Sequence, residues 1–165
     1  MEDTKNIIEI DTEKIERILT HIQNVQRNCY ALGLKLIKLG RTSIGRQLIA
    51  NGQIHDNSKF KGIEFADLFE GSPILNDVVS HHQSVNPHHP EYWDDITDMP
   101  EVYIAEMVCD WASRSAEMGT GLRDFIKDTQ APRYKFQLDD TVGKEITYFV
   151  NLLLVPTFKK LTPNE

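Results

Sequence analysis

The chain has 165 residues, a length that suits one domain with a single core, and we expect residues 1–165 to form that domain around a core of about 12–155. Charged residues make up 26% of the chain and hydrophobic residues 40%, which is typical of a folded globular protein and argues against disorder. The net charge of −7 disfavours a long nucleic acid or an anionic membrane as partner, so a small-molecule ligand is expected.

Apolar residues recur at intervals of three and four along nearly the whole chain, which predicts helices. Pro73 is expected in the first turn of the fourth helix, and Asp98 is expected to cap the fifth. Between helices, residues 86–99 are predicted to form a loop and residues 119–140 a short helix and a loop. Strand-like alternation is nearly absent, so the predicted fold class is all-α, with five to seven helices. The main helices are predicted at about 12–39, 42–55, 60–68, 73–82, 100–118 and 140–154.

The termini and the cysteines indicate where the protein resides. The N-terminal segment is acidic and lacks the apolar run of a signal peptide, and the longest apolar run is too short to span a bilayer. The two cysteines, Cys29 and Cys109, lie in apolar helical sequence. We therefore predict a cytoplasmic protein with reduced, buried thiols and no membrane contact.

Four of the six histidines fall within nine residues, around a predicted turn at Asn86-Pro87. His82 follows Val78 by one helical turn and is expected to point inward, with His81 beside it or toward solvent. The Asn-Pro turn can bring His88-His89 back toward the helix that carries His82. This segment is therefore predicted to contribute to a site rather than to lie free on the surface.

Three more positions carry chemistry-bearing side chains, and each has an ordinary interpretation. His21 is compatible with a partly buried core histidine, and His55-Asp56 with an imidazole that compensates a helix dipole. Asp110 interrupts the apolar stretch AEMVCDWAS and needs a partner, either Arg114 one turn later or a cation. Imidazole and carboxylate ligands from several helices can bind a transition metal without any cysteine.

In order and helical context, His21, His55-Asp56 and Asp110 resemble the H…HD…D signature of the HD-domain superfamily of helical metal-dependent phosphohydrolases. Over about residues 15–155 the chain more closely resembles a small bacterial and phage family within that superfamily. Its motifs HD-x-SKF, H-x3-N-x-HHPEYW and EM-x-CDW occur here starting at His55, His82 and Glu106.

The resemblance implies a divalent transition-metal ion (Mn, Fe, Co, Ni or Zn) and a metal-activated water that attacks phosphorus. The implied ligands are His21, His55, Asp56 and Asp110. Two arrangements of the histidine-rich loop stay open. Either Asp56 bridges to a second ion held by His82 and by His88 or His89, or there is one ion, and His88 and His89 act on the substrate or its leaving group.

Further residues are candidates for binding a phosphorylated substrate. Lys59 follows Asp56 by about one turn and is expected to bind a phosphate oxygen, with the Ser58 hydroxyl as an additional donor; a solvated surface charge is the ordinary alternative. Tyr92 and Trp93 are candidates for stacking on a base, although such a pair is often a hydrophobic plug. Many HD-domain phosphohydrolases carry an acidic residue soon after the HD pair. The nearest one here, Glu64, lies two turns later, so we do not expect it to act as a general acid or base. Four basic residues are candidates for contacting the phosphates of a polyphosphate substrate: Arg114, Arg123, Lys127 and Arg133.

We predict a phosphohydrolase of a small nucleotide, either a 5′-mononucleotide or a deoxynucleoside triphosphate. The alternatives are a phosphodiesterase of cyclic nucleotides or signalling oligonucleotides, an HD-fold diiron oxygenase, and a non-catalytic nucleotide-binding module. The sequence leaves open the substrate, the metal, the number of ions and the oligomeric state, for which a homodimer is one option.

Overall fold

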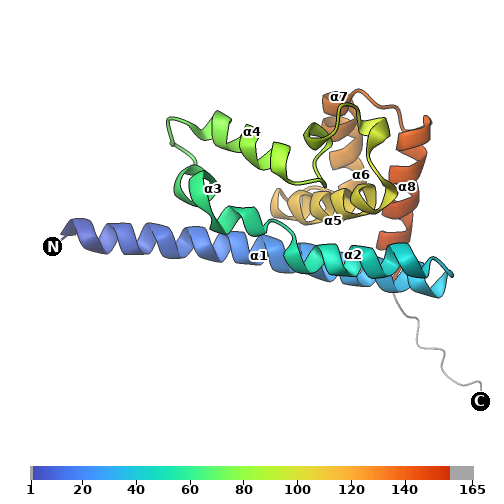
Figure 1. The fold of residues 1–165 in the computed structure, drawn as a ribbon, viewed down its shortest axis with the longest axis horizontal. Helices are drawn as coiled ribbons and strands as arrows, with labels where there is room; N and C mark the ends of the chain where they lie inside the picture. The colour runs from blue at the N-terminus through green and yellow to red at the C-terminus, as the bar shows by residue number, and fades with distance from the viewer. Residues whose placement is uncertain (1, 157–165) are drawn as a thin grey trace, which may run out of the picture.

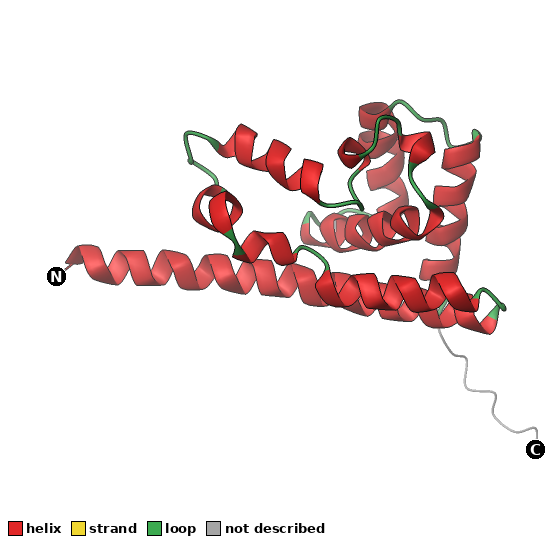
Figure 2. Cartoon of the chain, viewed as in Figure 1, coloured by secondary structure: helices red, strands yellow, loops and turns green. Residues whose placement is uncertain are grey.

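The structure is a computed structural model that describes the backbone of residues 2–156 and the side chains of residues 12–156 (Figure 1). The all-α prediction is confirmed, because every regular element within residues 2–156 is helical and none is a strand (Figure 2). None of the described helices is long and apolar enough to cross a membrane.

A long helix, α1, forms one side of the molecule, and α2 lies antiparallel beside its second half (Figure 1). Helix α5 packs on both, α8 packs on α1 and α5, and α3 and α4 contact each other beyond the α2 end. The η elements are short 3₁₀ turns, except η4, which is π-helical. The elements are α1 (Glu2–Lys38), α2 (Thr42–Ile54), η1 (Asn57–Phe60), α3 (Gly62–Asp67), α4 (Leu75–Val85), η2 (Pro90–Tyr92), η3 (Ile96–Asp98), α5 (Glu101–Glu117), α6 (Leu122–Phe125), η4 (Ile126–Gln130), α7 (Ala131–Tyr134) and α8 (Thr141–Leu154).

The turn between α1 and α2 and the close contact of these helices both depend on glycine. Gly40 has a φ of 84°, and the N–H groups of Gly40 and Arg41 donate to carbonyls in the last turn of α1, which closes that helix. Farther along, a Cβ atom on Gly45 would lie 2.5 Å from the carbonyl oxygen of Gly33. The absence of side chains at Gly33 and Gly45 therefore allows the two backbones to touch.

The hydrophobic core lies where α1, α2, α5 and α8 meet. Helix α5 is buried on nearly all sides from Ile104 to Trp111, where Glu106 and Asp110 are the two charged residues among apolar ones. Cys29 and Cys109 are both free and buried, as predicted. Other fully buried members of the core include Leu32, Leu36, Leu48, Ile146 and Phe149.

The prediction that Asp98 caps the fifth helix is wrong. Helix α5 begins after Pro100, which is extended and makes no side-chain cap hydrogen bond, and Asp98 instead ends η3. Because Met99 and Pro100 are both extended, the Asp98 carboxylate lies too early in the chain to reach the free N–H groups of α5. The carboxylate that does cap an element here is that of Asp95, which accepts from the Thr97 N–H at 2.8 Å.

The prediction that Pro73 lies in the first turn of the fourth helix is also wrong, since α4 begins at Leu75. The Ser72 hydroxyl oxygen accepts a hydrogen bond from the Ile74 N–H at 3.3 Å. This local turn offers the backbone an alternative to the helix, so Pro73 falls in the turn. Residues 119–140 are more helical than predicted, because α6, η4 and α7 follow one another without a break.

Candidate metal centre

The centre begins at the end of α2, where two consecutive residues leave the helix and turn inward. His55 is extended, and Asp56 has a left-handed backbone, with φ 56° and ψ 20°. This conformation is uncommon for any residue except glycine, and such strain occurs often at functional sites. As a result both side chains point into the protein, and each residue is only 2% exposed.

Helices α1 and α5 bring two more predicted ligands to the same point. His21 Nε2 lies 3.1 Å from Asp110 Oδ1 and 3.5 Å from Asp56 Oδ2. The Asp110 carboxylate thus has a histidine partner, whereas Arg114 pairs with Glu117 at 3.1 Å. The ordinary interpretation of Asp110 as the partner of Arg114 is therefore wrong.

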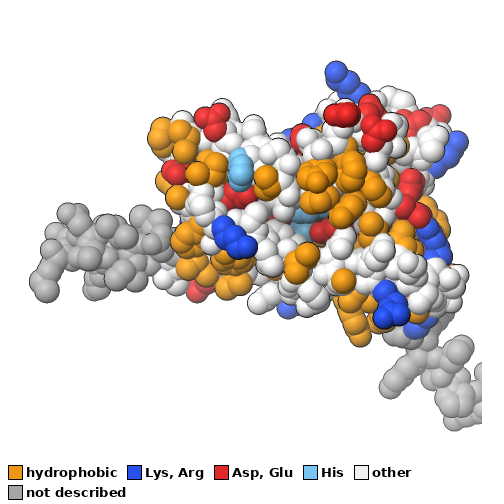
Figure 3. Space-filling view, in the orientation of Figure 1, with side chains coloured by type: hydrophobic (Ala, Val, Ile, Leu, Met, Phe, Trp, Pro, Cys, Tyr) orange, Lys and Arg blue, Asp and Glu red, His pale blue; other side chains and the backbone are white. Residues whose placement is uncertain are grey.

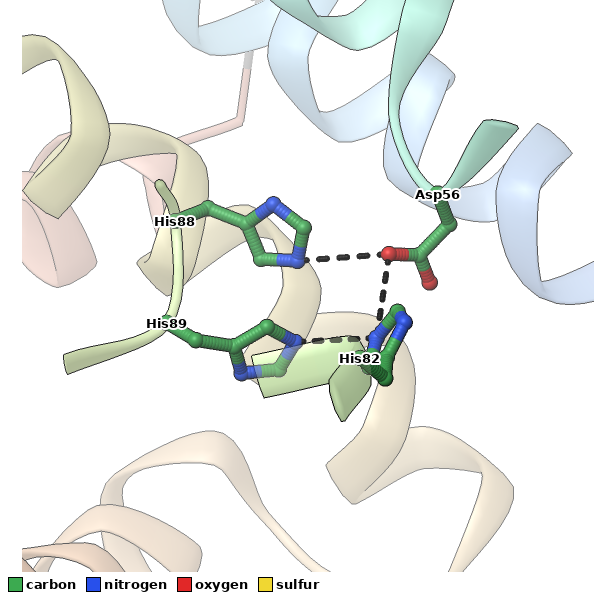
Figure 4. A group of neighbouring side chains, drawn as sticks. All are labelled: Asp56, His82, His88 and His89. Carbon is green, nitrogen blue, oxygen red and sulfur yellow. Dashed lines mark hydrogen bonds and ion pairs between the residues drawn. The ribbon is translucent and has the colours of Figure 1, made fainter. Parts of the chain in front are cut away.

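Helix α4 and the loop after it supply three histidines (Figure 4). His82 Nε2 and His88 Nε2 lie 3.4 and 3.3 Å from Asp56 Oδ1. His89 Nε2 lies 3.0 Å from His82 Nε2, so the loop does turn back toward α4 as predicted. Both histidines of the loop reach the cluster, where the sequence left open which one would.

The two oxygens of Asp56 face different sets of histidines. Oδ2 lies 3.5 Å from the Nε2 atoms of His21 and His55, whereas Oδ1 faces His82 and His88 (Figure 4). One carboxylate is therefore shared by two neighbouring sets of ligand atoms. Three groups of residues could each hold a metal ion, because the ligand atoms within each group lie within 4.8 Å of one another. The groups are Asp56, His82, His88 and His89; His21, His55 and Asp56; and His55, His88 and Asp110.

Carboxylates behind the histidines orient the imidazole rings. A carboxylate only accepts hydrogen bonds, so an Nδ1 atom bonded to it carries the proton and the Nε2 lone pair is free to bind a metal. This arrangement is found for three histidines, all with Nε2 toward the centre: His21 with Glu117 at 2.7 Å, His55 with Glu106 at 3.0 Å and His82 with Glu64 at 2.7 Å. His88 Nδ1 lies near the same Glu106 oxygen, at 3.4 Å.

Three buried atoms at the centre of the cluster lack a hydrogen-bond partner within the described residues: His55 Nε2, Asp56 Oδ1 and His88 Nε2. A buried polar atom without a partner costs about 1–3 kcal/mol, so three converging ones indicate a missing ligand. Imidazole nitrogen and carboxylate oxygen are the atoms that divalent metals from Mn to Zn accept. The donor set therefore fits such an ion.

The charges of the cluster are strongly coupled. Burial alone would raise the pKa of Asp56, but its electrostatic interactions with His55 and Lys59 outweigh burial and lower the pKa well below the usual range. Burial likewise opposes ionisation of Asp110, yet its hydrogen bond with His21 lowers the pKa of that carboxyl. Burial alone would lower the pKa of His21, but the carboxylates of Asp110 and Asp56 raise it to about 10. Without a metal, protons and Lys59 balance the buried negative charge.

The histidines of α4 and the loop differ in charge. Burial lowers the pKa of His82, and burial together with the charge of His88 lowers the pKa of His89 to about 3. For His88 the attraction to Asp56 exceeds the effect of burial, and the pKa is raised. His82 and His89 are thus neutral imidazoles near pH 7, the form that binds a metal.

A cavity of about 1140 Å³ opens beside the cluster. In Figure 3, histidine atoms (pale blue) lie next to acidic atoms (red) near the middle of the face in view. His55 and His88 are not among the residues that line the cavity, so they sit behind the other ligands. The cluster residues that do line it are His21, Asp56, Lys59, His82, His89 and Asp110.

Only some of the candidate substrate-binding residues line this cavity. Lys59 lines it, with Nζ 2.6 Å from Asp56 Oδ2, and Arg114 lines it as well. Ser58 instead supports the cluster, because its hydroxyl donates to Glu64 Oε2 at 2.9 Å. Tyr92 and Trp93 do not line the cavity, and the Trp93 indole N–H donates to the Pro87 carbonyl at 2.9 Å while the ring packs on the core.

The residues that support the ligands were not among those predicted from the sequence. Glu106 lies one turn before Asp110 in α5, and Asn51, which donates to Glu106 at 3.0 Å, lies one turn before His55. This spacing of four residues from a predicted ligand was the available signal. Glu64 was discounted for its distance along the chain, yet it is 1% exposed and contacts His82 directly.

Comparison with known proteins identifies a family without identifying a function. The sequence model of a family described as "Family of unknown function (DUF5662)" matches residues 11–152. No curated protein and no solved structure matches the chain. Because the match covers most of its length, the chain belongs to this family.

Proposed function

We propose that this member of the family is a metal-dependent phosphohydrolase of small nucleotides, with two divalent ions on either side of Asp56. The observation that carries the proposal is the Asp56 carboxylate. Its Oδ2 faces His21 and His55 at 3.5 Å, and its Oδ1 faces His82 and His88 at 3.4 and 3.3 Å. A carboxylate between two sets of imidazoles suits a bridging ligand, and paired ions can stabilise both the attacking and the leaving oxygen of a phosphoryl group.

Each ion would have four ligands from this chain. Ions bound there would supply Lewis acidity toward a phosphoryl oxygen and make a water molecule acidic enough to attack phosphorus near neutral pH. The first set is His21, His55, Asp56 and Asp110, and the second is Asp56, His82, His88 and His89.

Lys59 is the residue best positioned to orient the phosphate. Its Nζ lies at the cavity wall beside Asp56, and attraction to that carboxylate overcomes burial and raises the Lys59 pKa. The Lys59 ammonium group can donate hydrogen bonds to a phosphoryl oxygen. Arg114 and Arg133 also line the cavity, but they are paired with Glu117 at 3.1 Å and Glu91 at 2.8 Å. In a protein with net charge −7, bound metal ions together with Lys59 would supply the local positive charge that attracts an anionic substrate.

The size and lining of the cavity support a small substrate with an apolar part. At about 1140 Å³ it has room for a nucleoside with one or more phosphates. Trp111, Met118 and Phe125 form part of its lining. The same centre can act on a phosphate monoester or a diester, so the experiment must offer both.

The test is product formation, read by mass spectrometry, from mononucleotides, deoxynucleoside triphosphates, cyclic nucleotides and short oligonucleotides with added Mn²⁺. We expect hydrolysis of one class by the wild type and a loss of roughly 1,000-fold in Asp56→Asn, because several kcal/mol of transition-state stabilisation depend on the metal. Asp139→Asn, a change at an exposed aspartate outside the cavity, is the matched control.

Two results would contradict the proposal. One is the absence of product from every nucleotide by protein that contains metal. The other is equal activity in the wild type and Asp56→Asn. If the inactive protein carries iron and consumes oxygen, an oxygenase replaces the hydrolase, and if it binds nucleotides without turnover, a binding module does.

A further inference from the structure

A buried amide without a partner lies in the wall of the same cavity. Gln130 is only 5% exposed, yet it lines the cavity. Its side chain makes no hydrogen bond with any other residue in the part of the chain whose side chains are described. An amide has two donor hydrogens and an acceptor oxygen, and those of Gln130 are not among the fully enclosed polar atoms, so they stay accessible from the cavity. An amide held in this state is poised for a ligand that enters the cavity.

The backbone that carries Gln130 is unusual in a way that explains its position. Residues Ile126–Gln130 form the π-helical turn η4, in which the Ala131 N–H reaches back to the Ile126 carbonyl. Pro132 follows, and its ring clashes with the carbonyl four residues earlier in a regular α-helix, so a wider turn relieves the contact. A π turn adds one residue to the helix and shifts the face on which the next side chains lie, and such turns are frequent at functional sites.

The wall next to this amide is apolar and partly aromatic. Trp111 lines the cavity, and its ring lies nearly parallel to that of Tyr134, at 13° with centroids 6.2 Å apart. Tyr134 is itself held by a hydrogen bond from its hydroxyl to Glu91 at 2.9 Å. Phe125, from the helix that precedes η4, also lines the cavity and is almost fully buried. Aromatic surface beside an amide with free hydrogen-bonding groups suits a planar ring that must be oriented.

We propose that Gln130 and this wall form a subsite for a nucleobase, in which the amide makes paired hydrogen bonds with a donor and an adjacent acceptor on the edge of the base. The assignment deepens the proposed function and rests on it for the phosphate, but the base-binding step does not require metal. Glutamine is well suited to this role, since its amide matches such an edge in a bidentate manner. Gln130 would thus determine specificity, while the metal ligands carry out the reaction.

The kinetic test compares two substrates that differ in the leaving group, the preferred 5′-nucleotide and p-nitrophenyl phosphate. The variant is Gln130→Met, which keeps a long unbranched side chain but removes the hydrogen bonds. We expect the ratio of kcat/KM for the nucleotide to that for p-nitrophenyl phosphate to fall roughly 10- to 100-fold. Gln47→Met, at an exposed position on α2 outside this cavity, should leave the ratio unchanged. An unchanged ratio in Gln130→Met would overturn the assignment.

A binding experiment separates failure of this assignment from failure of the proposed function. Adenosine, guanosine, cytidine and uridine, which lack phosphate, are titrated into the metal-free protein by calorimetry. Binding of at least one nucleoside to the wild type, with a loss of roughly tenfold or more in affinity in Gln130→Met, supports the subsite even if no phosphate is hydrolysed. Absence of binding by every nucleoside at millimolar concentration, or equal binding by both proteins, overturns it.

Discussion

Glu106 orients His55 across the interface between α5 and α2: its Oε1 atom lies 3.0 Å from His55 Nδ1, and the two residues are 51 positions apart in the chain. The same oxygen lies 3.4 Å from Nδ1 of His88. Asn51 donates to the other oxygen of Glu106 at 3.0 Å and restricts its rotation. One buried carboxylate thus holds the His55 imidazole toward the centre of the cluster and lies close to a second imidazole, that of His88.

Removal of this carboxylate should weaken metal binding without removing a ligand. In Glu106→Ala we expect the metal affinity to fall roughly 10- to 100-fold, because the His55 ring loses the hydrogen-bond acceptor that sets its tautomer and orientation. Competition with a chromophoric chelator measures the affinity. The control is Asp139→Ala, which removes an exposed acidic group outside the cavity. An affinity for Glu106→Ala equal to that of the wild type would show that the carboxylate has no part in orienting the ligands.

The adjacent histidines of α4 should differ sharply in their effect on metal content. The His82 side chain is 9% exposed and faces Asp56, whereas the His81 side chain is 47% exposed and lies 3.7 Å from Glu64. We expect His82→Ala to lose about one of two ions per chain, because only the second ligand set contains His82. His81→Ala should keep the wild-type content by elemental analysis. Equal content in all three proteins would argue against a second ion at this position.

The contact between α1 and α2 gives a prediction about stability. A methyl group on Gly45 would lie 2.5 Å from the Gly33 carbonyl oxygen and 2.8 Å from a side-chain carbon of Ile37. Gly45→Ala should therefore force the helices apart and lower the free energy of unfolding by about 1–3 kcal/mol. Urea denaturation measures the loss. Gly121→Ala, where the nearest atom is an Asp124 side-chain oxygen at 3.4 Å, should have little effect.

Asp140 caps α8 and should stabilise the fold in a manner that depends on pH. Its carboxylate accepts from the N–H groups of Gly143 at 2.7 Å and Gln137 at 2.8 Å, and these hydrogen bonds lower its pKa below 3.8. Asp140→Ala should lower the free energy of unfolding by about 1 kcal/mol at pH 7.

The sign of the pH dependence follows from the lowered pKa. The extra stability of the charged carboxylate is present above pH 3.8 and is lost as the pH falls through the pKa in the folded protein. The difference between the wild type and Asp140→Ala, measured by urea denaturation, should therefore shrink between pH 5 and pH 3. A difference that is constant over this range would contradict the role of the charge.

Much of the fold could be predicted because helix periodicity is a local property. The spacing of Val25, Cys29, Leu32 and Leu36 predicted one buried face, and all four are fully buried. By the same reasoning His82, one turn after Val78, was predicted to be the inward histidine, and both residues are buried. The ends of helices were less predictable, since the start of α5 depends on the extended backbone at Met99 and Pro100 rather than on the nearest candidate cap.

The support of the site could not be predicted because it depends on contacts between distant segments. The spacing of Glu106 from Asp110 places both on one face of α5 but does not identify His55 as the partner of Glu106, and Glu64 is brought to His82 only by the packing of α3 against α4. The left-handed backbone conformation of Asp56, which sets the direction of both of its carboxylate oxygens, could not be predicted from the sequence either. Gln130 was overlooked because the π turn that positions it departs from ordinary helix periodicity.

If Asp56 binds metal through both of its oxygens, anomalous X-ray diffraction from crystals grown with Mn²⁺ will locate the ions on either side of its carboxylate. We predict two anomalous peaks, one between Asp56 Oδ2 and the imidazoles of His21 and His55, the other on the side of Oδ1 that faces His82. The same crystals of Asp56→Asn should show both peaks strongly reduced. An anomalous map of the wild type with no peak within coordination distance of Asp56 would contradict this binding mode.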